Sequence, residues 1–259
     1  MSLPDVAPAA PAPRAWEQVL EHVESRLLSG ELNAGDRLPG ERALSVELGV
    51  GRSSVREALR VLEVLGLIRT ATGSGPNAGA IIVSTPGGAM GSLMRLQVAA
   101  RGFPVADIVR TRLILESAVA GELADAVARG VDEDAPDGAP DLADAERLLA
   151  AMDDDGLEAS EFLALDAAFH LALAEASGNQ VVAATMAGLR SGIEAYASAG
   201  VARLADWDAT HARLREEHHG IVRAIRAADP EQARRAVADH ISGYYAETLP
   251  RSTEETSTW

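Results

Sequence analysis

Apolar residues recur every three or four positions along most of this chain, and this spacing predicts helices that each bury one face. Two short apolar runs, residues 67–70 and 80–83, instead predict a pair of strands joined by a Gly-rich tip. Gly, Pro and acidic clusters break the helical pattern between the elements. The predicted helices cover residues 15–28, 41–48, 52–65, 89–101, 105–128, 141–153, 158–176, 179–199, 204–227 and 230–247.

The same breaks predict how the chain is divided. Residues 1–13 are rich in Ala and Pro and are expected to form a disordered arm. A domain over residues 14–84 is followed by a Pro-Gly linker over 85–88 and by a helical domain over 89–249. The polar residues 250–259 are expected to form a flexible tail. Two domains are the usual expectation for a chain of 259 residues.

The stretch from Gly35 to Arg69 carries the clearest motif in the chain. It predicts two short helices around the Gly-Val-Gly turn at residues 49–51. In the second helix, Arg52, Arg56 and Arg60 recur every four residues and form a cationic stripe. The apolar face of that helix comprises Val55, Ala58, Leu59, Leu62 and Leu65. This pattern is typical of a helix-turn-helix, whose second helix enters the DNA major groove.

The motif resembles the winged-helix DNA-binding head of the GntR family of bacterial transcription regulators. The resemblance is carried by Gly35-Asp36-Arg37-Leu38-Pro39, Glu41-Arg42, Leu48-Gly49-Val50, Arg52 and Val55-Arg56-Glu57-Ala58-Leu59. The chain departs from the family at Gly40, where Ser is usual, and at Gly51, where Ser or Thr is usual. The second departure removes one hydroxyl contact to DNA.

The resemblance implies a mainly α fold, in which a winged helix-turn-helix with a small β-hairpin wing precedes an all-α helical bundle. The expected DNA contacts are Arg42, Arg52, Ser53, Arg56 and the wing glycine Gly73. Arg suits this role because its planar guanidinium can bond guanine O6 and N7 together. A solvated charge stripe on an ordinary helix would explain Arg52 and Arg56 alone, but not the whole run in register.

Composition narrows the alternatives. The net charge is -16, but residues 42–69 carry five Arg against three acidic residues, so this run is at +2. A locally positive surface on an acidic protein is consistent with DNA binding through a small area. All 23 cations are Arg, which excludes a Schiff-base lysine and the pyridoxal-phosphate branch of the GntR family. The chain has no Cys, no membrane-length apolar run and no visible secretory signal, so we expect a cytoplasmic protein.

Four polar residues stand within the apolar stripes of the helical domain. Asp166 and His170 are four positions apart, so both side chains can point at one ion. His218 shares a stripe with apolar residues, whereas its neighbour His219 falls at the edge or outside. His240 faces inward from the last helix. Imidazole and carboxylate ligands together suit a divalent transition metal. Each His taken alone, however, is more often an ordinary core or surface residue.

This set is similar to the metal ligands of the FCD domain, the ligand-binding domain of the FadR subfamily of GntR proteins. Many members have an Asp-x-x-x-His pair, a Glu-His motif and a final His 22 residues later, which correspond here to Asp166, His170, Glu217-His218 and His240. The resemblance spans nearly all of residues 15–247. We expect zinc foremost, with Ni, Mn, Co and Fe also compatible.

A buried cation is predicted on helix 105–128, where Arg112 lies in the stripe of Ile108, Leu115 and Val119. A buried Arg needs an anion. Its partner is either Glu116, one turn further on, or the carboxylate of an effector bound beside the metal, or both. His211 is expected to be a capping or partly exposed residue, with pocket lining as the alternative.

These observations predict a DNA-binding transcription regulator, of the repressor kind, that is not an enzyme. We expect a homodimer that reads the palindromic half-sites of a double-stranded operator and is controlled by a small carboxylate effector, with no membrane partner. One alternative is the same fold sensing an acyl-coenzyme A or another ligand, with only a structural metal. The other is a metalloenzyme, against which stand four protein ligands and the lack of an obvious general base.

Overall fold

The computed structural model describes residues 14–71, 79–83, 88–100, 102–130 and 139–248. The chain forms two compact units, residues 1–89 and 90–259, called the N-terminal unit and the helical unit below. The predicted arm and tail, most of the predicted linker, and Gly73 lie outside the described residues. None of the described helices is long and apolar enough to cross a membrane.

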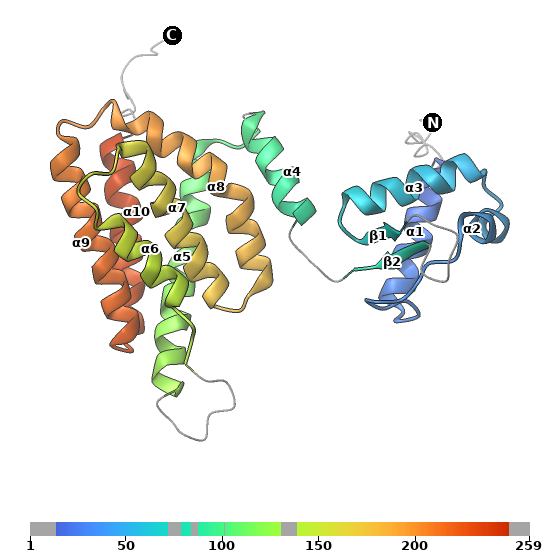
Figure 1. The fold of residues 1–259 in the computed structure, drawn as a ribbon, viewed down its shortest axis with the longest axis horizontal. Coiled ribbons are helices and arrows are strands. Elements are labelled where there is room, and N and C mark those ends of the chain that lie inside the picture. The colour runs from blue at the N-terminus through green and yellow to red at the C-terminus, as the bar shows by residue number, and fades with distance from the viewer. Residues whose placement is uncertain (1–13, 72–78, 84–87, 101, 131–138, 249–259) are drawn as a thin grey trace, which may run out of the picture. The chain divides into compact units, whose positions relative to one another are not determined.

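The described part of the N-terminal unit combines three helices with a two-stranded antiparallel hairpin (Figure 1). Its elements are α1 (Ala15–Leu28), α2 (Glu41–Leu48), α3 (Arg52–Val64), β1 (Ile68–Ala71) and β2 (Gly79–Ile82). One apolar cluster joins them and includes Val19, Val23, Leu44, Val55, Ala58, Leu59, Leu62 and Ile82. Each large side chain buried there stabilises the unit by roughly 1.5–3 kcal/mol. The predicted helix-turn-helix and hairpin are confirmed.

Two glycines set where the helices of this motif end. Gly49 ends α2 with φ +65°, and Gly66 follows α3 with φ +68°. This left-handed conformation is strained for residues that carry a Cβ, so glycine is favoured at both helix ends. The prediction that Leu65 belongs to the buried face is wrong, because this residue is 47% exposed. Helix α3 ends at Val64, and Leu65 lies in the turn beyond the buried face.

The base of the hairpin is attached on two sides. The backbone N–H of Thr70 in β1 donates to the Glu63 carboxylate near the end of α3, at 3.0 Å. On the other side, the Leu38 N–H donates to the Ala80 carbonyl of β2 at 2.9 Å. The strands therefore keep a defined position next to α3 and to the segment that leads into α2.

The described part of the helical unit is wholly α-helical. Its helices are α4 (Gly88–Ala99), α5 (Val105–Gly130), α6 (Ala143–Met152), α7 (Ala159–Ala176), α8 (Gln180–Val201), α9 (Trp207–Arg226) and α10 (Pro230–Thr248). Helix α5 is central and packs against α7, α8, α9 and α10 (Figure 1). Large side chains without solvent exposure fill the space between them, among them Phe162, Phe169, Ile221 and Ile225. The predicted mainly α fold class is confirmed.

Capping residues correct the starts of two predicted helices. The Asp206 side chain accepts a hydrogen bond from the Ala209 N–H at 3.1 Å, so α9 begins at Trp207 and not at residue 204. The Asn179 carboxamide accepts from the Val181 and Val182 N–H groups, so α8 begins at residue 180. These short polar side chains satisfy backbone donors that have no partner within the helix.

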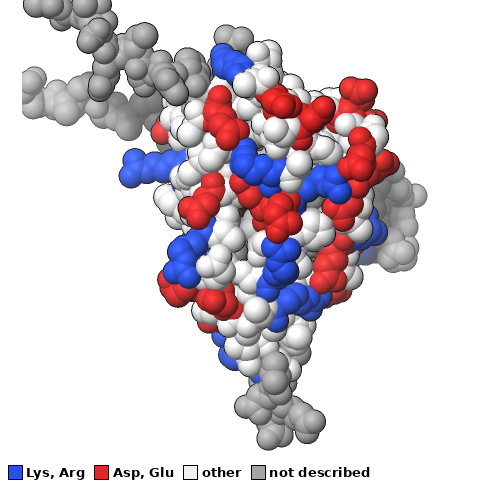
Figure 2. All heavy atoms as spheres, turned by 90° about the vertical axis from the view of Figure 1, so that its left-hand side faces the viewer, with Lys and Arg blue, Asp and Glu red and all other residues white. Residues whose placement is uncertain are grey.

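Charged side chains on the face of the helical unit that carries α9 are interleaved by sign (Figure 2). Two exposed pairs of α9 illustrate this, Arg223 with Glu216 and Arg226 with Glu146, each at 2.7 Å. Such pairs contribute only ~0.2–1 kcal/mol each. They also neutralise one another, so this face offers no continuous cationic surface of the kind that binds phosphates.

Candidate functional site

Three helices bring together the four side chains that the sequence singled out as metal ligands. Asp166 and His170 come from α7, His218 from α9 and His240 from α10, and all four are buried. One ligand atom from each lies within 4.8 Å of all the others. The atoms that converge are the Nε2 atoms of the three rings and Oδ1 of Asp166.

The distances within this cluster are short. Oδ1 of Asp166 lies 2.9 Å from Nε2 of His218, 3.5 Å from Nε2 of His240 and 3.9 Å from Nε2 of His170. The Nε2 atoms of His170 and His240 are 3.1 Å apart. One carboxylate oxygen thus faces three imidazole nitrogens around a common point.

Helix phase decides which of two adjacent histidines enters the cluster. His218 has no exposed surface and lies on the same face of α9 as Leu214 and Ile221. His219 points the other way, is about one-third exposed, and its Nε2 lies 3.0 Å from Oδ1 of Asp153. The predicted orientations of both side chains are confirmed.

Two carboxylates touch the outer ring nitrogens of the cluster. The Nδ1 atom of His240 is hydrogen-bonded to Oε2 of Glu217 at 3.0 Å. The Nδ1 atom of His170 lies 2.6 Å from Oε2 of Glu116. Neither glutamate was expected in this role from the sequence, because neither contact follows from the spacing along one helix.

The charges in the cluster suit cation binding. Burial alone would raise the pKa of Asp166, but the adjacent His218 and His240 rings hold it well below its usual range. Burial, aided by His240, lowers the pKa of His218 to about 4, so that ring is neutral at pH 7. Burial disfavours a charged His240, yet Asp166 and Glu217 raise its pKa. An anionic carboxylate therefore faces a neutral imidazole donor.

The cluster passes a simple test for a metal site. Nε2 of His218 is buried and makes no well-aligned hydrogen bond, although Oδ1 of Asp166 is only 2.9 Å away. An atom in this position is satisfied if both side chains bind one cation. Three imidazoles and one carboxylate form a donor set that suits divalent transition metals.

A second buried group lies beside the cluster. Arg112 is 4% exposed, and its Nε donates to Oε1 of Glu116 at 2.7 Å while its Nη1 donates to the Tyr196 hydroxyl at 2.6 Å. Burial opposes the charged forms, but the pair holds the pKa of Glu116 at about 2 and keeps Arg112 protonated. The first of the two partners considered from the sequence, Glu116, is therefore present.

A small cavity of about 10 Å³ separates Arg112 from the cluster. It is lined by Arg112, Leu163, Asp166, Tyr196, Ala197, Leu214, His240, Ile241 and Tyr244. This volume is about that needed to hold one water molecule. Inside the bundle, the cavity therefore has Arg112 on one side and the ligand cluster on the other.

His211 does not behave as expected. It is only 9% exposed, its ring meets Phe162 edge-on at 4.5 Å and stacks on Trp207 at 5.8 Å. The prediction of a capping or partly exposed residue is wrong, since Asp206 caps α9 and the following turn packs onto α7. His211 is also absent from the cavity lining, so its role is aromatic packing.

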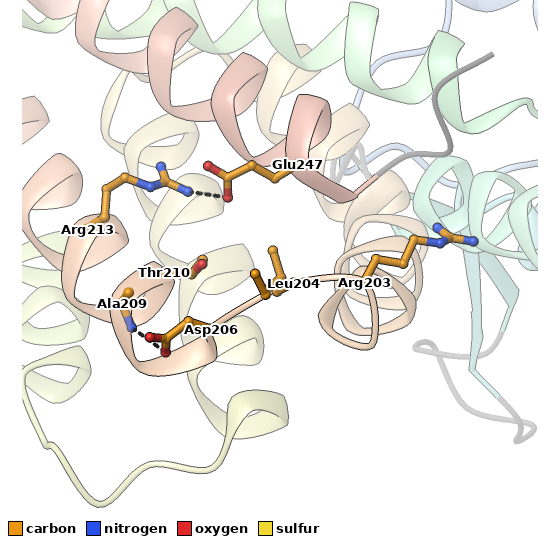
Figure 3. A pocket seen from close by; sticks show the side chains of 8 residues that line it. Arg203, Leu204, Asp206, Ala209, Thr210, Arg213 and Glu247 are labelled. Atoms are coloured by element: carbon orange, nitrogen blue, oxygen red, sulfur yellow. Dashed lines mark hydrogen bonds and ion pairs between the residues drawn. The ribbon is translucent and has the colours of Figure 1, made fainter. Parts of the chain in front are cut away.

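A larger hollow of about 470 Å³ opens on the surface, between the α8–α9 loop and the end of α10. Figure 3 shows Arg213 and Glu247 reaching toward each other there, with their ion pair at 2.8 Å, and Asp206 at the start of α9. Arg213 also binds Glu217, which contacts His240. This hollow is thus connected to the buried cluster through two side chains.

The predicted DNA-contacting residues within the described chain lie on the surface of the N-terminal unit. Arg42, Arg52, Ser53 and Arg56 are all exposed. The guanidinium of Arg56 forms a two-point contact with Glu41, through Nε at 3.3 Å and Nη2 at 3.0 Å. This contact between α2 and α3 orients Arg56 in the middle of the cationic stripe.

Two family matches together cover most of the chain. Residues 15–76 match the bacterial regulatory proteins of the gntR family. Residues 107–243 match the FCD domain, and this second match contains all four residues of the buried cluster. The pair of domains is the one that the resemblance to the FadR subfamily led us to expect.

Similar proteins include a transcriptional repressor and a transcriptional activator. The chain is 31% identical over 242 residues to the HTH-type transcriptional repressor NanR of Cronobacter sakazakii, covering 89% of this chain and 84% of the relative. It is 30% identical over 232 residues to the Glc operon transcriptional activator of Escherichia coli K12, covering 87% and 85%. The solved structure of Streptococcus agalactiae GntR aligns with a TM-score of 0.50 at 25% identity, over 88% of this chain and 98% of that one.

Proposed function

Because this chain belongs to the GntR family of bacterial transcription regulators and carries an FCD domain, we propose that a metal ion and a small organic acid in the helical unit control its DNA binding. The family matches and the relatives are regulators, so the chain is not an enzyme. The observation that carries the proposal is the buried cluster of Asp166, His170, His218 and His240 beside a cavity with an Arg.

The four cluster residues would hold the metal. Bound there, the ion supplies a Lewis-acidic centre to which a carboxylate oxygen can bind. Zinc with four protein ligands is typically a closed, structural site, whereas ions that prefer six ligands keep positions for an effector. We therefore propose zinc for a structural role and Ni, Mn, Co or Fe for an effector-binding one.

The effector site would be the cavity between Arg112 and the cluster. Arg112 already binds Glu116 through Nε, while its Nη1 contacts the Tyr196 hydroxyl at the cavity wall. A carboxylate that replaces this hydroxyl would gain a charge-assisted hydrogen bond. A cavity of about 10 Å³ has to widen for this, which favours a small acid over an acyl-coenzyme A.

Widening of the cavity offers a physical route to α4. Tyr196 lies on α8, and the same helix meets α4 so closely that a Cβ at Gly188 would lie 2.8 Å from the Cβ of Met94. Helix α4 begins shortly after β2 along the chain. An effector that displaces α8 would thus move the helix that leads to the N-terminal unit, and would change the population of DNA-binding arrangements.

On the DNA side, we propose that Arg42, Arg52, Ser53 and Arg56, with the wing glycine Gly73, contact the operator. The support is their exposure, except for Gly73, and the match of this segment to the gntR family. A homodimer would place two such motifs on palindromic half-sites. Repression is the direction we propose, in line with the NanR relatives.

Arg52→Ala and Arg56→Ala should each weaken binding to a selected operator by roughly 1–3 kcal/mol and relax base choice at one position per half-site. Fluorescence anisotropy at fixed salt measures the affinities. Arg26→Ala is the matched control, because Arg26 is a paired surface cation of the same unit on α1. If Arg52→Ala and Arg56→Ala lose no more affinity than Arg26→Ala, the reading helix is misassigned.

Metal and effector are tested on the full-length protein purified without chelators. Elemental analysis gives the metal content, and native mass spectrometry detects a retained acid. Operator affinity is then measured with a panel of short mono- and dicarboxylic acids, before and after metal removal. We expect one metal per chain and a coupling free energy of ~1–3 kcal/mol that disappears with the metal. Metal-free protein that still responds fully would contradict the proposal.

A further inference from the structure

We infer that Glu217 and Glu116 are positioning residues of the metal site, each fixing one histidine ring through the nitrogen that faces away from the cluster. The inference rests on the proposed metal-binding function. It concerns the ring orientation and tautomer of His240 and His170, which the four ligands cannot set by themselves.

The chemistry follows from the two nitrogens of imidazole. A neutral ring carries one N–H and one lone pair, and a metal binds the lone pair. A carboxylate on Nδ1 keeps the hydrogen there and leaves Nε2 free for the metal. Nδ1 of His240 is hydrogen-bonded to Glu217 at 3.0 Å, while its Nε2 points into the cluster, 3.5 Å from Oδ1 of Asp166.

A carboxylate also faces the outer nitrogen of the second ring, at ion-pair distance but without hydrogen-bond alignment. Oε2 of Glu116 lies 2.6 Å from Nδ1 of His170, whose Nε2 lies 3.1 Å from Nε2 of His240. His218 differs, because its Nδ1 is buried and, among the described residues, its ion pair with a carboxylate is made at Nε2. Its ring is held by packing instead, edge-on to Phe169 at 5.0 Å. Two of the three rings are thus oriented by carboxylates.

Each carboxylate is in turn held by an arginine. Glu116 binds Arg112 at 2.7 Å, and both side chains are about 5% exposed or less. Glu217 binds Arg213, and this pair is about one-third exposed, with side-chain exposures of 28% and 33%. The contacts Arg112–Glu116–His170 therefore border the proposed effector cavity through Arg112. The contacts Arg213–Glu217–His240 end at the surface hollow of Figure 3.

The two Arg–Glu–His contacts differ in how well the fold tolerates a substitution of the glutamate. Glu116→Gln leaves Arg112 buried without its counterion, and this variant can fail to fold. Glu217→Gln is milder, because Arg213 is partly solvated and keeps its contact with Glu247 at 2.8 Å. Glu217→Gln is therefore the decisive variant. Its matched control is Glu216→Gln, the adjacent residue, which is 71% exposed and pairs only with Arg223 among the contacts described.

The experiment removes metal from full-length protein and titrates it with Zn²⁺ against a chromophoric chelator, and with Co²⁺ while recording visible absorption. We expect Glu217→Gln to bind Zn²⁺ ~10–100-fold more weakly than the parent. Its Co²⁺ spectrum should differ from that of the parent, because one ring is no longer oriented. Glu216→Gln should match the parent in both measurements.

Three results would contradict either the proposed metal binding or the positioning role of Glu217. A parent protein that binds no metal refutes the proposed function itself. A parent that binds metal, with Glu217→Gln equal to Glu216→Gln in affinity and spectrum, refutes the positioning role. A variant with unchanged metal affinity but a lower melting temperature in the metal-free state shows that Glu217 is structural only, which also refutes it.

Discussion

His218→Ala is expected to empty the metal site, whereas His219→Ala is expected to leave it filled. His218 is fully buried with Nε2 at 2.9 Å from Oδ1 of Asp166, while His219 points outward to Asp153. Loss of a direct ligand should exceed the roughly 10–100-fold loss of affinity that removal of an outer partner causes. We therefore expect metal content near zero for His218→Ala and near one per chain for His219→Ala.

Elemental analysis of both variants, purified side by side without chelators, compares their metal content per chain. Because the two positions are adjacent on α9 and both carry imidazole, the comparison isolates orientation from residue type. Circular dichroism of both proteins checks that the bundle is intact. Metal retained in a folded His218→Ala protein, or lost from His219→Ala, would mean that α9 does not present His218 to the ion.

Arg112→Ala should have the largest effect on stability. Arg112 and Glu116 form a buried ion pair at 2.7 Å, so removing the cation leaves a buried carboxylate without its partner. Breaking such a pair typically costs ~3–5 kcal/mol. For a domain of this size each kcal/mol lowers the melting temperature by roughly 2–4 °C, so we expect a fall of roughly 6–20 °C.

A double variant separates this structural effect from effector binding. In Arg112→Met with Glu116→Gln, both charges are removed together, so no unpaired charge is buried and most of the stability should return. The proposed carboxylate contact at Nη1 is absent in this protein. We expect the double variant to bind its operator with parental affinity and to lose the ~1–3 kcal/mol of coupling to the effector.

Thermal melts and operator titrations with and without the effector acid found by native mass spectrometry test both parts. The metal content of the double variant is measured as well, because Glu116 also contacts His170. A stable, metal-loaded double variant that still releases DNA normally would remove Arg112 from the effector site. A single variant Arg112→Ala as stable as the parent would show that the buried pair contributes little.

Local patterns in the sequence determined the helices, their phases and the composition of the cluster. Helical spacing alone placed His218 inside and His219 outside, because an inward stripe fixes which side of α9 is buried. The pair Asp166 and His170 follows from one turn of a single helix in the same way. Glycine and capping residues likewise predicted most helix ends to within a few positions, since their effects act over a single turn.

Only the tertiary structure decided which side chains of different helices meet. Tyr196 reaches Arg112 across 84 positions, and Glu116 reaches His170 from another helix, so no spacing within one element could reveal either contact. The burial of His211 against Phe162 has the same origin. An apolar stripe defines the buried face of a helix, but packing between helices determines the partners that this face finds.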